Sequence, residues 1–525
     1  MITSHFPVKE ENFWKVNKFF LLLFVIFVAI HAGILLWMRI YPFVDLSFHL
    51  AAATIYRHIH DEGNQFSQYY YLDTFLKPNT FHLWFCSLSI FPSVEFANKV
   101  YYTIYVLLFP LAIVLIIKHL KGNIWIALLA LILLYNYSMV FGFAGYTMAM
   151  PSVMFCYYFF LKSIDSKSYW SIIMLAAWLV MLFFMHALVT LFCIGVVSVG
   201  TIFIYRNERR KLWTRLLVIV PALIIIAYWW STSQRDSDMI GFLKEYYSTQ
   251  YFPEIWKRIN FLYYDNLVLF KGIAGNIAGT FFSMFIYLPL GYVLTTQKEK
   301  IKNSLKDPQI VFAWMIFLFS AAGHLFLPPR IPDQEILFER FSVFESLGAI
   351  ILISIYLPAR HQRTIKVAVI FAVSLHCLLW VNFFIGFEKK TEAFTENIFP
   401  EDTRNVRVAS IIGDYFYQKM QSYIMFSDYY ITWKKGIAVT SIIDYRFGSV
   451  RRKVDEHILP RFNHWMANKG VYHKEYNEME YILTNDELPA CFKDSLADFT
   501  EVKRQGNWKL LKNTKVRHVT RQGNS

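Results

Sequence analysis

The sequence is poor in charged residues and in the motifs that build soluble catalytic sites. Charged side chains make up 17% of the 525 residues, and the five cysteines are scattered without a CxxC pair. This spacing indicates small packing residues and argues against a disulfide framework or a zinc site. The chain also lacks a glycine-rich loop followed by Lys and Ser or Thr, and it has no nucleophile elbow. These absences exclude P-loop nucleotide enzymes and α/β-hydrolases.

Apolar residues dominate the composition instead. Hydrophobic residues make up 56% of the chain and aromatic residues 19%, and the mean hydropathy is +0.35. Apolar runs of about 20 residues recur, which is the length a helix needs to cross the hydrocarbon core of a bilayer. The net charge of +14 lies largely in short loops between these runs, as membrane topology requires, and no basic face for nucleic acid stands apart from them. We therefore expect an integral membrane protein whose partner is the lipid bilayer and not nucleic acid.

The basic loops also predict the topology. Clusters of Lys and Arg at residues 206–215, 298–306 and 360–366 belong on the cytoplasmic side, so the apolar runs between them must cross in even numbers. The expected architecture is all-α: a cytoplasmic N-terminus (1–18), a transmembrane domain (19–387) with an outer loop (41–98), and a small extracytoplasmic C-terminal α/β domain (388–525). The short apolar stretch 80–91 is expected to lie at the membrane surface. About eleven spans are predicted, at residues 19–38, 100–117, 124–140, 148–161, 169–185, 187–205, 212–230, 275–294, 310–327, 341–357 and 367–387.

The outer loop carries an acid and a histidine that could do chemistry. Asp45 and His49 are spaced i, i+4 and would share one face of a helix. At a membrane exit, a carboxylate can act as a general base, and a histidine can act as its proton partner or as a metal ligand. The structural alternative is a helix N-cap, because Asp45 precedes a helix-forming segment. A divalent metal is compatible with these residue types, but no ligand spacing identifies one, so the cofactor stays unknown.

A second set of candidates surrounds the outer end of the tenth predicted span. Arg340 enters this span, where a guanidinium can hold a phosphate or a carboxylate through two parallel hydrogen bonds. Glu339 and Arg330 lie beside it, and ion pairs that anchor the helix end explain this patch equally well. His186 lies at the outer end of another span, where a lone histidine is more often a packing residue than a ligand. We take Arg340, Glu339, Arg330 and His186 as candidate substrate-binding residues.

In their order along the chain, these features resemble the membrane-embedded glycosyltransferases of the GT-C type, which include protein mannosyltransferases and aminoarabinose transferases. The resemblance covers roughly residues 15–387. It rests on a first span followed by DLSFHLAAATIY (45–56), and then on GFAGYTMAMP (142–151), MHALVTLF (185–192) and ERF (339–341).

This resemblance implies transfer of a sugar from a polyprenyl-linked donor at the outer face of the membrane. It implies that Asp45 is the base that assists attack by an acceptor hydroxyl or amine, and that Arg340 contacts the donor phosphate. No second carboxylate is clearly placed as a nucleophile, which favours inversion at the anomeric carbon. Two departures from the family pattern are present. The acidic pair that many members carry in the first loop is a single Asp45 followed by Leu46, and no WWD-type motif occurs in the C-terminal region, which argues against an oligosaccharyltransferase.

Two other functions remain open at this point: a transporter or flippase of lipid-linked saccharides, and a non-catalytic membrane protein of polysaccharide assembly. A transporter would favour charges in the middle of spans, whereas the charges here collect at span ends and in loops. We therefore expect an inverting transferase of the cell envelope, in a bacterial inner membrane. Its partners would be a lipid-linked sugar donor and a saccharide, lipid or protein acceptor.

Overall fold

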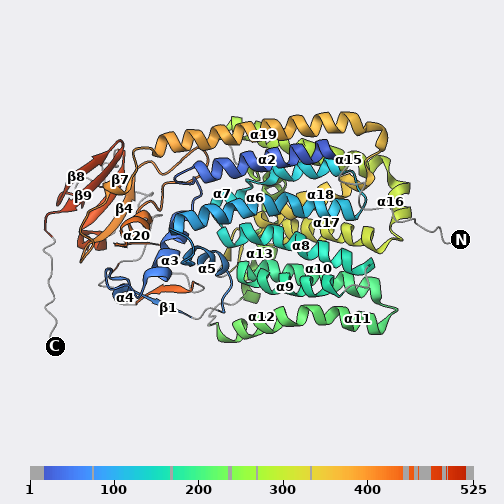
Figure 1. Ribbon diagram of the computed structural model, residues 1–525, viewed down its shortest axis with the longest axis horizontal. Helices are drawn as coiled ribbons and strands as arrows, with labels where there is room; N and C mark the ends of the chain where they lie inside the picture. The colour runs from blue at the N-terminus through green and yellow to red at the C-terminus, as the bar shows by residue number, and fades with distance from the viewer. Residues whose placement is uncertain are drawn as a thin grey trace.

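The structure is a computed structural model that describes residues 17–73, 76–165, 169–233, 239–267, 270–331, 334–440, 448–453, 459, 474–486, 492 and 495–515. Long helices lie side by side through most of the molecule, and a small sheet domain sits at one end of them (Figure 1). The predicted fold class, a helical membrane bundle with a small C-terminal α/β domain, is confirmed.

Most of the predicted spans appear as long apolar helices. Seven helical segments of the described chain are long and apolar enough to cross a membrane by length and composition. They are Lys18–Trp37 (α2), Val94–His119 (α6), Ala187–Tyr205 (α10), Arg209–Thr232 (α11, η2 and α12), Ile273–Thr296 (α15), Pro308–Phe326 (α17) and Gln362–Ile398 (α19 and η5).

The other four predicted spans contain helices as well, although the span predicted at 124–140 is interrupted at 134–136, before α7 (Tyr137–Phe141) begins. These helices are η1 (Ile124–Leu133), α8 (Ala144–Asp165), α9 (Trp170–Met185) and α18 (Phe338–Tyr356). The first of these is a 3₁₀ helix with all of its residues buried. Because a 3₁₀ helix rises about 2.0 Å per residue, this segment extends further than an α-helix of equal length would. The sequence pattern therefore located the helical segments, although only seven of them meet the length and hydropathy expected of a membrane span.

Basic side chains lie at one end of the bundle. At the end opposite the C-terminal domain, Lys300 of α16 (Lys298–Ser304) donates to the Ile355 carbonyl at 2.9 Å, and Arg360 donates to the Tyr292 hydroxyl at 3.2 Å (Figure 1). We call this the basic end, and the other the domain end. The grouping agrees with the spans predicted from positive charge, and the compartment that each end faces stays a prediction.

The C-terminal domain is built on one mixed sheet. Its strand order is β5-β4-β7-β9-β8, in which β5, β4 and β7 run parallel while β9 and β8 are antiparallel. Aromatic rings fill its core, and Phe426 stacks on Trp508 with ring centres 5.2 Å apart. The elements are β4 (Arg407–Ile412), α20 (Asp428–Lys434), β5 (Ile437–Ala438), η7 (Lys474–Glu478), β7 (Tyr481–Asn485), β8 (Phe499–Gln505) and β9 (Trp508–Asn513).

The domain is fastened to the loop that follows the first span. Strand β1 (Tyr70–Leu72) pairs antiparallel with β6 (Val450–Arg452). The Ser422 hydroxyl donates to the Pro42 carbonyl at 2.7 Å, close to Asp45 in the chain. The domain therefore holds the segment that carries the candidate base.

Short elements complete the domain end. Residues 80–91, predicted to lie at the membrane surface, contain only the seven-residue helix α5, which is too short to cross a bilayer. The remaining elements are α3 (Leu46–His58), α4 (Phe66–Tyr69), α5 (Phe81–Ser87), α7 (Tyr137–Phe141), α13 (Met239–Thr249), α14 (Tyr251–Asn260), η3 (Phe261–Asp265), β2 (Arg330–Ile331) and β3 (Gln334–Glu335), and η4 (Ala359–His361) lies at the basic end.

Candidate functional site

Asp45 stands directly before α3 and is held in place by its backbone. The amides of Val44 and Asp45 donate to the carbonyls of Val140 and Phe141 in α7, at 3.2 and 3.0 Å. Asp45 occupies the N-cap position, yet its side chain makes no capping hydrogen bond to α3. The carboxylate is therefore not used by the helix, and the capping alternative does not explain this residue.

A glycine makes this close approach possible. Gly142 has a φ of +96°, and a Cβ built on it would lie 2.6 Å from the Asp45 amide nitrogen and 3.1 Å from its Cα. Both the left-handed backbone and the contact require a residue without a side chain. The end of α7 and the start of α3 thus meet only because glycine stands at this position.

Replacing this glycine should displace the acid. We expect Gly142→Ala to lower the free energy of unfolding by about 2 kcal/mol, from the positive φ and the backbone clash together. Thermal unfolding of the purified protein measures this. Gly195→Ala is the matched control, because a Cβ there meets nothing within 4 Å. Equal melting temperatures for the two variants would contradict the packing described here.

The surroundings of Asp45 change its acidity. Burial raises the pKa of its carboxyl to about 8, and the nearby positive charge of Arg340 opposes the rise. Because the burial effect is the larger one, the carboxyl binds a proton far more tightly than an exposed aspartate does. A carboxylate with a pKa near neutrality is a stronger base than an ordinary one, which suits proton abstraction.

Arg340, in the first turn of α18, is held among aromatic rings. Its guanidinium carbon lies 4.4 Å from the centre of the Phe143 ring and 5.7 Å from that of Tyr146. One terminal nitrogen lies 2.6 Å from Nε2 of His186, and the Tyr146 hydroxyl donates to the Arg340 carbonyl. Its Nε is enclosed and has no partner among the described residues. The site therefore contains a cation with an unused donor, and this cation interacts electrostatically with Asp45.

His186 lies at the junction of α9 and α10 and contacts Arg340 directly. Burial, with the neighbouring Arg340 charge, lowers the pKa of this imidazole well below its usual value, so the ring is neutral. Since Arg340 can only donate, Nε2 of His186 must accept and the proton sits on Nδ1. The longer contact of 3.4 Å from the Val189 amide to Nδ1 is then not a hydrogen bond. His186 orients the arginine fork.

Glu339 precedes Arg340 and adds a second acid to the site. Its Oε2 atom is enclosed and has no hydrogen-bond partner among the described residues. Together with Asp45 and Asp265, it interacts electrostatically with Tyr137 of α7. The folded chain therefore brings near Asp45 an acid that the first loop itself lacks.

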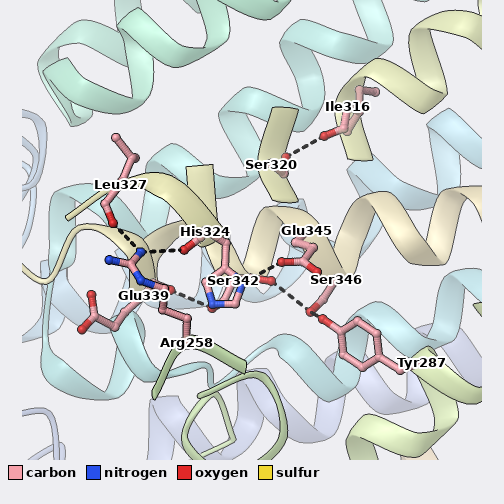
Figure 2. Close-up of polar contacts among 10 residues, drawn as sticks. All are labelled: Arg258, Tyr287, Ile316, Ser320, His324, Leu327, Glu339, Ser342, Glu345 and Ser346. Atoms are coloured by element: carbon pink, nitrogen blue, oxygen red, sulfur yellow. Dashed lines mark hydrogen bonds and ion pairs between the residues drawn. The ribbon is translucent and has the colours of Figure 1, made fainter. Parts of the chain in front are cut away.

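A buried polar network supports α18 behind these residues (Figure 2). Arg258 of α14, which is fully buried, donates to the carbonyls of His324 and Leu327 at the end of α17. The imidazole of His324 is hydrogen-bonded to the Glu345 carboxylate of α18, with 2.6 Å between Nδ1 and Oε2. The cation satisfies carbonyls that the helix end leaves unpaired. The network thus ties α14, α17 and α18 together just behind Arg340.

Two sequence-predicted residues lie apart from this group. His49 is one turn along α3 from Asp45, but its ring packs on that of His82, with centres 5.5 Å apart. Burial and His82 lower the pKa of His49 well below its usual value, so it is a neutral ring. Arg330 lies exposed in the β2–β3 hairpin, and no contact between described residues connects its side chain with Asp45 or Arg340.

Within the described ranges, no three or more His, Cys, Asp or Glu side chains are grouped so that they could hold a metal ion. Asp45, Arg340 and His186 contact one another or interact electrostatically without any such ligand set.

An apolar groove of about 270 Å³ opens beside the site, between α5, α6, α8 and α9. Met185, one of its lining residues, directly precedes His186 in the chain, and His186 contacts Arg340. Its lining residues are Phe81, Phe85, Tyr101, Ile104, Leu108, Met148, Met174, Ala177, Trp178, Met181 and Met185.

Sequence reasoning missed several parts of the site. The aromatic cradle of Phe143 and Tyr146 lies in the GFAGY stretch, which the sequence analysis used only as a motif of the family resemblance. Arg258 stood in a loop with no distinctive motif, and Glu345 lies inside a predicted span. The statement that charges collect only at span ends is therefore wrong for Glu345, because His324 on the next helix provides it with a partner.

Comparison with known proteins supports the fold. The sequence matches no known protein-family profile and no curated protein. The structure is similar to the crystal structure of ArnT from Cupriavidus metallidurans bound to undecaprenyl phosphate, with a TM-score of 0.51 and 13% sequence identity. The match covers 94% of this chain and 98% of that chain. The chain therefore has the fold of the GT-C transferases, as the sequence resemblance predicted, and it is an integral membrane protein.

Proposed function

We propose that this protein is an inverting membrane glycosyltransferase that moves a sugar from a polyprenyl phosphate to an acceptor at the domain end of the bundle. The main support for the proposal is that three features lie close together. An acid with a pKa raised to about 8, a partly unpaired arginine and an apolar groove meet at one place. Since ArnT has the same fold and was crystallised with undecaprenyl phosphate, a lipid-linked phosphate is the natural ligand to test.

Each group has a role in a single displacement. Asp45 accepts the proton of an acceptor hydroxyl or amine as the acceptor atom attacks the anomeric carbon. The bond from that carbon to the phosphate oxygen breaks, and the polyprenyl phosphate leaves with the bonding electrons. Arg340 stabilises the negative charge that grows on the leaving oxygen. One displacement on one face of the sugar inverts the configuration of the anomeric carbon.

The position of Arg340 suits a phosphate that comes from the membrane. His186 occupies one terminal nitrogen, which leaves the side of the fork that carries Nε for the ligand. The ring of Phe143 holds the guanidinium in place, so little conformational freedom is lost on binding. The groove beside Met185 would accept the first isoprene units of the lipid.

Lipid binding tests this proposal directly. We expect Arg340→Gln to weaken binding of undecaprenyl phosphate about tenfold to a hundredfold, because a hydrogen bond to a charged group contributes about 1.5–3 kcal/mol. Ala177→Trp should weaken it through the tail, since Ala177 lines the groove and is exposed there. The affinity is read from the melting temperature of the purified protein at increasing lipid concentration.

The control is Ala322→Trp, at an exposed position of α17 that does not line the groove. It should bind the lipid as the wild type does. If Arg340→Gln and Ala177→Trp both keep wild-type affinity, neither the phosphate contact nor the tail groove exists, and the proposal fails.

The location follows from charge. If the basic end faces the cytoplasm, as short basic loops do in membrane proteins, then the site lies at the outer face of a bacterial inner membrane. A transporter of lipid-linked saccharides fits the structure less well than a transferase does. The hydrogen-bonded pair inside predicted spans, His324 with Glu345, is buried and does not line the apolar groove.

A further inference from the structure

We infer that the acceptor is a neutral saccharide, bound along an aromatic strip that runs from α7 to the C-terminal domain. This inference rests on the proposed transferase function and deepens it. The strip consists of Tyr137, Phe141, Phe143, Tyr415 and Phe416, which are all only half-buried.

Three rings of the strip form a continuous row beside the site. Tyr137 lies 5.7 Å from Phe141, and Phe141 lies 4.8 Å from Phe143, measured between ring centres. Phe143 carries the Arg340 guanidinium on its face. The row therefore ends at the cation to which the proposal assigns the donor phosphate.

The C-terminal domain continues the row through one loop. Tyr415 and Phe416 lie in the loop after β4, with their ring centres 4.5 Å apart. Lys419 of the same loop contacts Asp265, and Lys271 lies 5.4 Å from the Phe416 ring. The loop thus rests on the segment that follows η3.

The segment that follows η3 also contacts α7, so it connects the loop after β4 with the aromatic row of α7. The Tyr137 amide donates to the Asn266 carbonyl at 3.1 Å, and Asn136 forms an isolated bridge with Leu267. The C-terminal domain also contacts the segment that carries Asp45, because the Ser422 hydroxyl donates to the Pro42 carbonyl at 2.7 Å. These contacts connect both halves of the strip to the segments around the candidate base.

Three acidic side chains lie near Tyr137, the first ring of the same row. Asp45, Glu339 and Asp265 all interact electrostatically with Tyr137, and the Oε2 atom of Glu339 is enclosed without a partner among the described residues. Carboxylates accept hydrogen bonds from sugar hydroxyls, while the apolar C–H faces of a sugar pack on aromatic rings. The strip therefore offers a saccharide both kinds of contact, with carboxyl groups for its hydroxyls and aromatic rings for its apolar faces.

The charges disfavour other acceptors. Arg340 is assigned to the donor, and Lys419 is paired with Asp265. Lys271, beside the Phe416 ring, is the third cation near the strip, and three acids near Tyr137 (Asp45, Glu339 and Asp265) match these three cations in number, so no surplus of formal positive charge remains for a phosphorylated or acidic acceptor. The apolar groove is lined by residues of α5, α6, α8 and α9 and by none of the rings of the strip, so a lipid tail has its place elsewhere.

Binding without donor tests the inference. Full-length protein in nanodiscs is mixed with neutral gluco-, manno-, galacto- and N-acetylhexosamine trisaccharides, with glucose 6-phosphate, and with a Ser/Thr peptide, and saturation-transfer NMR measures binding. We expect at least one neutral trisaccharide to bind, and neither the phosphosugar nor the peptide. Phe416→Ala should weaken this binding about tenfold, and Phe416→Trp should retain it.

Phe252→Ala is the matched control, because this ring is 76% exposed on α14 and lies outside the strip. Binding of no trisaccharide, preference for the phosphosugar or the peptide, or equal binding by Phe416→Ala and Phe252→Ala would each overturn the inference. Because the assay contains no donor, these failures leave the lipid-binding test untouched. If undecaprenyl phosphate binding still depends on Arg340, the acceptor inference falls while the proposed function stands.

Discussion

Asp45→Asn protein is expected to fold and to bind undecaprenyl phosphate while losing sugar transfer by about 10²–10⁴-fold, the usual contribution of a general base. The amide has the size of the carboxylate but cannot accept the acceptor's proton. Because the Asp45 side chain makes no capping hydrogen bond, the change removes no structural contact of α3. Release of undecaprenyl phosphate from a sugar-loaded donor measures the rate.

The control lies on the same loop. Asp61→Asn changes an exposed aspartate that pairs with His58, and it should leave the rate unchanged. Wild-type activity in Asp45→Asn, or an equal loss in both variants, would contradict the assignment of Asp45 as the base.

The rate should also depend on pH in a way that reports Asp45. Its pKa is raised to about 8, so the carboxyl is mostly protonated and inactive as a base at pH 6. The rate of transfer should rise about tenfold per pH unit up to about pH 8 and then level off. Since Arg340 opposes the rise in pKa, Arg340→Gln should move the midpoint to higher pH. A flat profile between pH 6 and 9 would exclude a base with this environment.

The spans were predictable because a bilayer imposes one strong requirement on a sequence. Apolar length and the placement of Lys and Arg identify the segments, even where the helix itself is unusual, as in η1. The resemblance to GT-C enzymes added an order of motifs, and the fold comparison agrees with it. Bilayer physics says nothing, however, about which helix ends meet.

The contacts within the site could not be predicted, because bilayer constraints do not determine which helix ends meet. Arg340 and His186 are 154 positions apart, and no spacing rule connects them. The i, i+4 relation of Asp45 and His49 was correct as helix geometry, yet His49 packs against His82 because α5 covers that face. Local periodicity describes one helix, whereas a site is made where several helices end.

The buried pair in α17 and α18 gives the largest expected effect on stability. Glu345→Ala should lower the free energy of unfolding by about 3 kcal/mol, because it leaves the imidazole of His324 buried without its partner and opens a cavity. Ser320→Ala is the control, since its hydroxyl bonds only to the Ile316 carbonyl one turn back in the same helix (Figure 2). That change should cost less than about 0.5 kcal/mol. Unfolding in mixed micelles gives both values.

A double substitution separates pairing from packing. His324→Phe with Glu345→Leu replaces both polar groups by apolar ones of similar size, and it should restore most of the stability that Glu345→Ala loses. The rate of sugar transfer shows whether the pair also affects the site, because α18 carries Arg340 in its first turn. If the pair only supports the helix, the double variant regains activity together with stability. Recovered stability without recovered transfer would instead mean that the polar pair acts on Arg340 or Glu339. A Glu345→Ala protein as stable as Ser320→Ala would mean that the pair does not stabilise the fold.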